Sequence, residues 1–133
     1  MLNEATLSYV SQHSHDDVRM LALQGCKDPD VDLTLALQQI QGRQTARHKL
    51  PSWAEVDGII YPPHLNMEQC SSELTARYKS QIVNRISVNG ESVNRKFLDL
   101  TGGFGVDFAF MAGAFDEAVY VERDEQLCAI ANR

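Results

Sequence analysis

The stretch that decides the fold is "DLTGGFGVDF", residues 99–108, in which an acidic residue is followed at once by a glycine-rich turn. The apolar residues of "KFLDLT" predict a short buried strand before the turn, and "VDFAFMAGA" predicts a helix after it. Glycines at such a junction let a ligand approach the main chain, and the helix directs its first backbone N–H groups toward that ligand. The stretch therefore predicts a site for a nucleotide-like cofactor.

A second strand and a further helix follow this turn. "EAVYVE" is rich in β-favouring residues and ends on Glu122, and "DEQLCAIANR" begins a helix. Strand, glycine turn, helix, strand and helix begin a doubly wound parallel sheet, so we expect an α/β fold with a Rossmann-like domain over 89–133. Because neighbouring parallel strands end at one edge, Asp99 and Glu122 should face one crevice beside Gly103 and Gly105.

Residues 1–88 predict a separate helical domain. Apolar residues at helical spacing occur in "NEATLSYVSQ", "DDVRMLALQ", "DPDVDLTLALQQIQGRQTAR" and "MEQCSSELTARYKSQIVNRI". Ser14 and Asp17 have the spacing of a capping box at the start of the second helix, and Gly25 should end it. Asn66 is the predicted cap of the last helix. The polar stretch "SVNGESVNRK" then predicts a linker to the first strand.

Composition limits the class of protein. The chain has 133 residues, of which 44% are hydrophobic and 23% charged, as in ordinary globular domains. Its formal charge of -6 is not that of a protein that binds nucleic acid over its whole surface. The lone thiols of Cys26, Cys70 and Cys128 fit a reducing compartment and argue against a zinc or disulfide framework. With no long apolar run and no signal sequence, we expect a cytoplasmic protein that does not enter a membrane.

Three ligand classes compete for the glycine turn. A nucleoside triphosphate calls for GxxxxGK[ST], and no lysine follows these glycines. A dinucleotide calls for a small residue where Phe108 stands, and Asp107 is an unfavourable neighbour for a pyrophosphate. S-adenosylmethionine has a cationic amino acid end that Asp99 can receive directly or through water. The residues favour this third class of ligand.

"FLDLTGGFGVDF" resembles the first motif of the class I S-adenosylmethionine-dependent methyltransferases, with Thr101 in place of the usual first glycine. Glu122 stands where that family has an acidic residue that accepts hydrogen bonds from the ribose hydroxyls. Together with "MEQCSSELTARYK", the motif is similar to a bacterial group that carries a C-terminal THUMP-like domain and is distantly related to cap guanine-N2 methyltransferases. The resemblance implies methylation of an RNA acceptor. It implies cofactor binding by Asp99, Thr101, Gly102, Gly103, Phe104, Gly105, Glu122 and Arg123.

The same resemblance implies that the chain is the N-terminal portion of a longer enzyme. The family places an acceptor-positioning motif, Asp or Asn followed by Pro-Pro and an aromatic residue, after the fourth strand, and this chain has none. No catalytic residue is assigned for that reason, and we expect the 133-residue chain to bind cofactor weakly and to be inactive alone. Apolar side chains of a partly covered sheet should also favour self-association; these are Phe97, Leu98, Val119 and Val121.

Several alternatives stay open. The chain can instead be a non-catalytic helical module with a partial nucleotide-binding fold that works through a partner, or the glycine turn can be a tight connection without a ligand. The acidic and histidine residues of "HSHDD" are interpreted as a helix cap, with no metal expected. A helix that contains Glu68, Gln69, Ser71 and Ser72 is a candidate lid over the crevice. A basic cluster either favours the helix dipole or contacts RNA; it comprises Arg43, Arg47, His48 and Lys49.

Overall fold

The structure, a computed structural model, describes residues 2–88 and 95–132. The chain forms two compact units, Met1–Glu68 and Gln69–Arg133. The unit boundary therefore precedes residues 69–88, which the helical pattern had assigned to the N-terminal domain. The predicted linker falls mainly on 89–94, outside the described residues.

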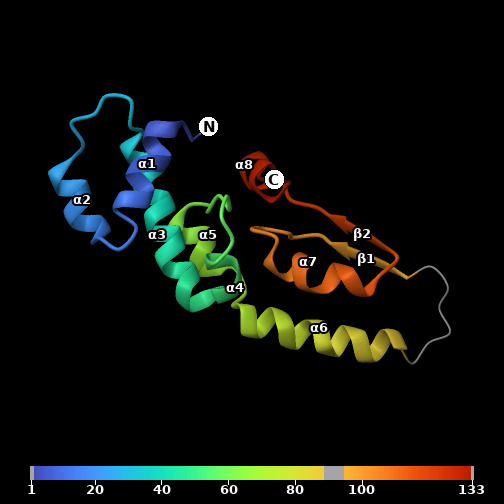
Figure 1. The fold of residues 1–133 in the computed structure, drawn as a ribbon. Coiled ribbons are helices and arrows are strands. Elements are labelled where there is room, and N and C mark those ends of the chain that lie inside the picture. Colours follow the sequence, from blue (N-terminus) through green and yellow to red (C-terminus); the bar gives the residue numbers. More distant parts are fainter. Residues whose placement is uncertain (1, 89–94, 133) are drawn as a thin grey trace. The chain divides into compact units, whose positions relative to one another are not determined.

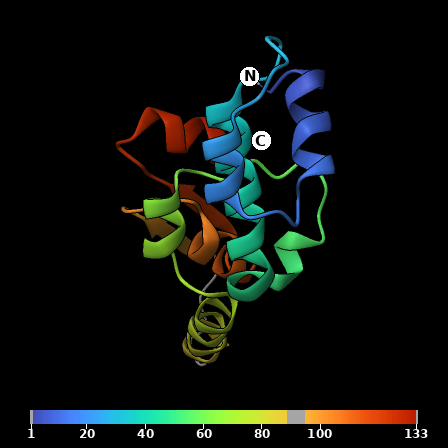
Figure 2. The same ribbon diagram turned by 90° about the vertical axis from the view of Figure 1, so that its left-hand side faces the viewer.

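The first unit is helical (Figure 1). Its longest helix, α3, contacts α1, α2 and α4. Helices α1 and α2 lie beside α3 in both ribbon views (Figure 2). Helix α3 ends at Lys49 because Leu50, the residue before Pro51, avoids the helical conformation. Pro51 is then the first residue of α4. The helices are α1 (Glu4–Gln12), α2 (Val18–Gln24), α3 (Leu33–Lys49), α4 (Pro51–Ala54) and α5 (His64–Gln69).

The start of α2 differs from the prediction, whereas its end agrees. Asp17 caps the helix alone, because its side chain accepts hydrogen bonds from the amides of Arg19 and Met20. Ser14 is therefore not the cap, and the capping-box interpretation was wrong. Gly25 ends α2 with a positive φ of 70°, as predicted.

A buried glutamine organises the core of the first unit. Gln39 is 4% exposed. Its side-chain oxygen accepts a hydrogen bond from the Tyr61 amide at 2.8 Å, and its side-chain nitrogen donates one to the Tyr61 carbonyl at 2.9 Å. Gly42, one turn further along α3, leaves room for Tyr61, since a β-carbon there would lie 2.3 Å from that residue's Cβ. The extended segment before α5 is thus fixed to α3 although it forms no strand.

The single long helix predicted from Met67 onward is broken. Helix α5 ends at Gln69 and α6 (Glu73–Val88) begins after Ser72, whose hydroxyl accepts a hydrogen bond from the Thr75 amide at 3.2 Å. Serine competes with helix continuation by bonding nearby backbone, which explains the break. The expected cap Asn66 lies inside α5, so that prediction was wrong.

The second unit contains the predicted strand, turn, helix, strand and helix. Strands β1 (Lys96–Asp99) and β2 (Glu117–Tyr120) pair in parallel, with Asp99 opposite Tyr120. Between them, α7 (Val106–Met111) and the short 3-10 helix η1 (Ala112–Ala114) pack against α6 (Figure 1). Helix α8 (Glu125–Ala131) follows β2. Within 2–88 and 95–132, no helix combines the length and apolar character needed to cross a bilayer.

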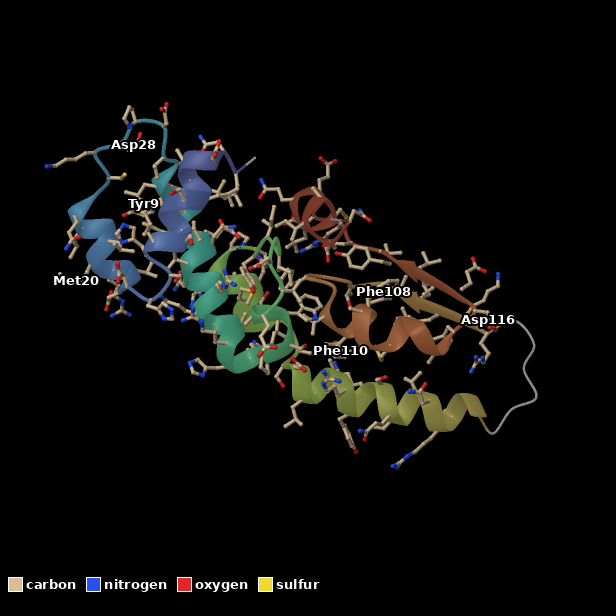
Figure 3. The ribbon with its side chains drawn as sticks, in the orientation of Figure 1. Tyr9, Met20, Asp28, Phe108, Phe110 and Asp116 are labelled. Carbon is tan, nitrogen blue, oxygen red and sulfur yellow. The ribbon has the colours of Figure 1, made fainter. Side chains whose placement is uncertain are left out.

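One face of the two-stranded sheet is covered and the other is open. Phe97 stacks on Phe108 of α7 at 5.7 Å between ring centroids and on Phe115 at 5.2 Å, and Figure 3 shows Phe108 between α7 and the strands. On the opposite face the paired residues Leu98 and Val119 are 56% and 43% exposed. The aromatic cluster therefore fixes α7, and the turn that precedes it, to one side of the sheet.

Candidate functional site

The two acidic residues predicted to face one crevice lie at the same edge of the sheet. Asp99 is the last residue of β1, and Glu122 lies two residues beyond the end of β2. Each carboxylate bonds the turn that follows β1. Asp99 Oδ1 accepts a hydrogen bond from the Thr101 amide at 3.1 Å, and Glu122 Oε2 accepts one from the Gly103 amide at 2.8 Å. The turn is thus held from both strands.

Four backbone N–H groups of the turn donate hydrogen bonds within the chain. Besides the amides of Thr101 and Gly103, the Gly102 amide donates to the Val121 carbonyl at 2.9 Å and the Gly105 amide to the Gly102 carbonyl at 2.7 Å. These four amides are therefore not available to a ligand, whereas α7 begins after Gly105 without a side-chain cap in the described part of the chain.

The three glycines are required for two different reasons. Gly103 and Gly105 have φ values of 56° and 83°, in the left-handed region that disfavours a β-carbon. Gly102 has no positive φ, but a β-carbon there would lie 2.0 Å from Cε2 of Tyr120. Two glycines thus allow the backbone to turn, and the third allows an aromatic ring to approach the main chain.

Tyr120, the last residue of β2, was not predicted as a site residue. Its hydroxyl donates a hydrogen bond to the Gly103 carbonyl at 2.6 Å, and its ring meets Phe108 edge-on at 5.7 Å between centroids. Burial, helped by neighbouring acidic groups, raises the pKa of Tyr120 to about 12, so the hydroxyl remains a donor at neutral pH. The sequence showed only a β-favouring aromatic residue here, because its partner is seventeen positions earlier.

Glu122 joins the turn to the start of α8. Its second oxygen, Oε1, accepts a hydrogen bond from the Asp124 amide at 2.9 Å, and Asp124 caps α8 through the amides of Gln126 and Leu127. Backbone hydrogen bonds from Asp124 and Gly103 lower the pKa of Glu122, so the carboxylate is ionised at neutral pH.

The other predicted site residues lie around this edge with different exposures. Thr101 and Arg123 are exposed, and the positive charge of Arg123 contributes to the lowered pKa of Glu122. Phe104 is 6% exposed, so its ring belongs to the core. The structure therefore gathers the predicted residues at one edge and makes Asp99 and Glu122 its central acceptor groups.

A polar cluster at the start of α7 was also missed. Asp107 Oδ2 accepts hydrogen bonds from Ser71 Oγ at 2.8 Å and from Lys79 Nζ at 2.6 Å, and Lys79 also donates to Ser71 at 2.9 Å. The other oxygen, Asp107 Oδ1, is buried without a hydrogen-bond partner among the described residues. Ser71 thus reaches the helix that follows the turn. Glu68 and Gln69 lie in α5 whereas Ser71 and Ser72 precede α6, so the four residues of the candidate lid do not form one helix.

The basic cluster at the end of α3 makes contacts within its own unit. Arg43 pairs with Asp57 at 3.3 Å, Arg47 bonds the ring of His15 at 3.0 Å, and Lys49 bonds the carbonyls of Met67 and Glu68. These contacts fix loops of the first unit to α3. The RNA contact of this cluster stays a prediction.

The scan against protein-family models finds no match, and neither does the search of curated proteins. A solved structure, described as a "putative methyltransferase" from Porphyromonas gingivalis W83, matches with a TM-score of 0.71 and 26% sequence identity. The chain has a methyltransferase-like fold. The match covers 100% of this chain and 32% of that one, so the chain spans about a third of the length of that protein.

Proposed function

We propose that this chain belongs to a class I S-adenosylmethionine-dependent methyltransferase and that the edge formed by Asp99, the glycine turn and Glu122 binds the cofactor. The observation that carries the proposal is the pair of carboxylates, Asp99 and Glu122, that both bond the glycine turn at one edge of the sheet. An edge with two carboxylate acceptors suits a ligand that bears a cationic group and hydroxyl groups. S-adenosylmethionine has an ammonium group, a sulfonium centre and two ribose hydroxyls.

The two carboxylates have separate roles in this proposal. A carboxylate offers about four lone-pair sites, and Glu122 uses sites on both oxygens to hold Gly103 and Asp124. Its remaining capacity suits the ribose hydroxyls. Asp99 accepts the Thr101 amide through one oxygen and can attract the ammonium group of the amino acid end.

The bound cofactor would supply an electrophilic methyl group, and the chain's own residues would bind and orient it. Catalysis of this kind depends mainly on positioning, which a turn bonded to two strands favours. For the acceptor we propose RNA, on the basis of the sequence resemblance to the bacterial group with a THUMP-like domain. The activity is proposed for the whole protein, of which this chain supplies the cofactor edge.

The experiment is a comparison of ligand classes by isothermal titration calorimetry. We expect S-adenosylhomocysteine to bind the chain, with NADH and ATP giving no saturable heat. Glu122→Ala should weaken binding by about tenfold, equivalent to about 1.4 kcal/mol. Glu55→Ala, which removes an exposed carboxylate of the first unit, is the matched control and should bind as the wild type does.

Preferential binding of NADH or ATP would contradict the proposal. Absence of any S-adenosylhomocysteine binding, with the fold verified by circular dichroism, would favour the alternative of a non-catalytic module whose glycine turn is only a tight connection.

A further inference from the structure

We infer that Tyr120 is a positioning residue that holds the glycine turn in the shape needed for the cofactor. The inference depends on the proposed function for the identity of the ligand. The effect of Tyr120 on the turn is independent of the proposed function, because it can be measured without a ligand.

The ring of Tyr120 occupies the space beside two glycines. At Gly102, a β-carbon would lie 2.0 Å from Cε2 and 2.4 Å from Cδ2 of the ring, closer than side chains approach one another. At Gly105, the same ring lies 3.8 Å from an ideal β-carbon position, which is ordinary contact. Because Phe108 packs edge-on against the ring, Tyr120 cannot move freely away from the turn.

The hydroxyl of Tyr120 completes a two-sided hold on Gly103. The Gly103 carbonyl accepts from Tyr120 at 2.6 Å while the Gly103 amide donates to Glu122 at 2.8 Å. Both partners come from the end of β2, so they fix this residue against one strand end. Gly103 has a left-handed φ of 56°. Glycine adopts many other backbone conformations as readily, so the two hydrogen bonds are what stabilise this one.

This hold also determines where Glu122 lies. If Gly103 turned away, Glu122 would lose a hydrogen bond that fixes its carboxylate, the group proposed to receive the ribose. Tyr120 therefore acts on the ligand through the turn and through Glu122.

The test compares Tyr120→Phe with Tyr78→Phe, which removes a hydroxyl from an exposed tyrosine on α6. Two readouts are taken from the full chain: hydrogen exchange of the Gly103 and Gly105 amides by NMR, and affinity for S-adenosylhomocysteine. We expect Tyr120→Phe to accelerate exchange at both amides by about fivefold or more and to weaken binding by a similar factor, about 1 kcal/mol. Tyr78→Phe should leave both unchanged.

The outcomes separate the two proposals. Unchanged exchange in Tyr120→Phe would overturn the positioning role. Faster exchange with unchanged affinity would overturn its relevance to the ligand. If S-adenosylhomocysteine fails to bind the wild type, the proposed function and the ligand part of the inference both fail, and exchange alone decides whether Tyr120 holds the turn.

A second pair of variants tests the ring. Gly102→Ala should accelerate exchange at Gly103 because its β-carbon displaces the ring. In a Tyr120→Ala background the space is open, so adding Gly102→Ala should cause little further change. Equal effects of Gly102→Ala in both backgrounds would show that ring and glycine are not coupled.

Discussion

The amide nitrogen of Gly103 lies 2.8 Å from Oε2 of Glu122, so the loop after β1 is bonded directly to the loop after β2. This bond joins residues nineteen positions apart and is strengthened by the negative charge of the carboxylate. It makes the candidate cofactor edge a part of the second unit's stability as well as a proposed binding site.

The first prediction concerns the pH dependence of the stability that Glu122 contributes. Hydrogen bonds lower the folded-state pKa of Glu122, so its contribution to stability is present above the unfolded-state pKa and is lost as pH falls through the lowered value. At neutral pH, Glu122→Gln should reduce the free energy of unfolding by about 1 kcal/mol. Urea titrations should show this difference shrinking as pH falls below about 4, with the pH range following from the reference glutamate pKa. A difference that grows in acid would contradict the assignment.

The second prediction concerns Gly105, whose φ is 83°. Gly105→Ala meets no atom closer than 3.8 Å, so its cost should come from backbone strain alone, about 1–2 kcal/mol of unfolding free energy. Gly113→Ala is the matched control, because Gly113 has no positive φ and open space around its β-carbon position. In thermal unfolding, Gly113→Ala should have a Tm equal to or above that of the wild type. A Gly105→Ala chain as stable as the wild type would show that the turn adopts another backbone in solution.

The third prediction concerns Asp107 of α7, which bonds Lys79 of α6 and Ser71, two residues before α6. Both charged side chains are partly exposed, at 27% for Asp107 and 42% for Lys79, so the ion pair is screened by solvent. Asp107→Ala should therefore cost about 1 kcal/mol, more than a surface pair but less than a buried one. Asp57→Ala, at a side chain 96% exposed and paired with Arg43, should cost less than about 0.5 kcal/mol. Equal effects in urea titrations would show that the cluster adds nothing to the packing of α6.

The fourth prediction concerns the open face of the sheet. Leu98 and Val119 lie opposite each other and are 56% and 43% exposed, so this face should favour association of copies at high concentration. Replacing both with lysine should abolish concentration-dependent sedimentation without unfolding the chain. A wild-type chain that sediments as a monomer at every concentration would contradict this expectation.

The order of elements around the glycine turn was predictable because each depends on local pattern. Apolar runs identified β1 and β2, and the glycines marked the turn between strand and helix. The parallel register then brought Asp99 and Glu122 to one edge, since parallel strands end on the same side.

Features that depend on distant partners were not predictable. Tyr120 reads as an ordinary strand residue until Gly102 and Gly103 are placed against it, and Asp107 reads as a helix-start acid until Lys79 is near. The break at Ser71 and Ser72 was missed because helical periodicity continues through it. The sequence also showed no sign that the amides of Thr101, Gly102 and Gly103 bond Asp99, Val121 and Glu122, since these bonds depend on the pairing of the two strands.

The most direct test of the cofactor assignment is an NMR titration of the ¹⁵N-labelled chain with S-adenosylhomocysteine, which detects weak binding residue by residue. We predict saturable shifts that begin at the amides of the turn, 101–105, and at those of 121–124 beyond β2, while the amides of α1 and α2 stay unchanged. Shifts confined to other parts of the chain, or no saturable shift at the turn, would contradict the assignment of this edge as a cofactor site.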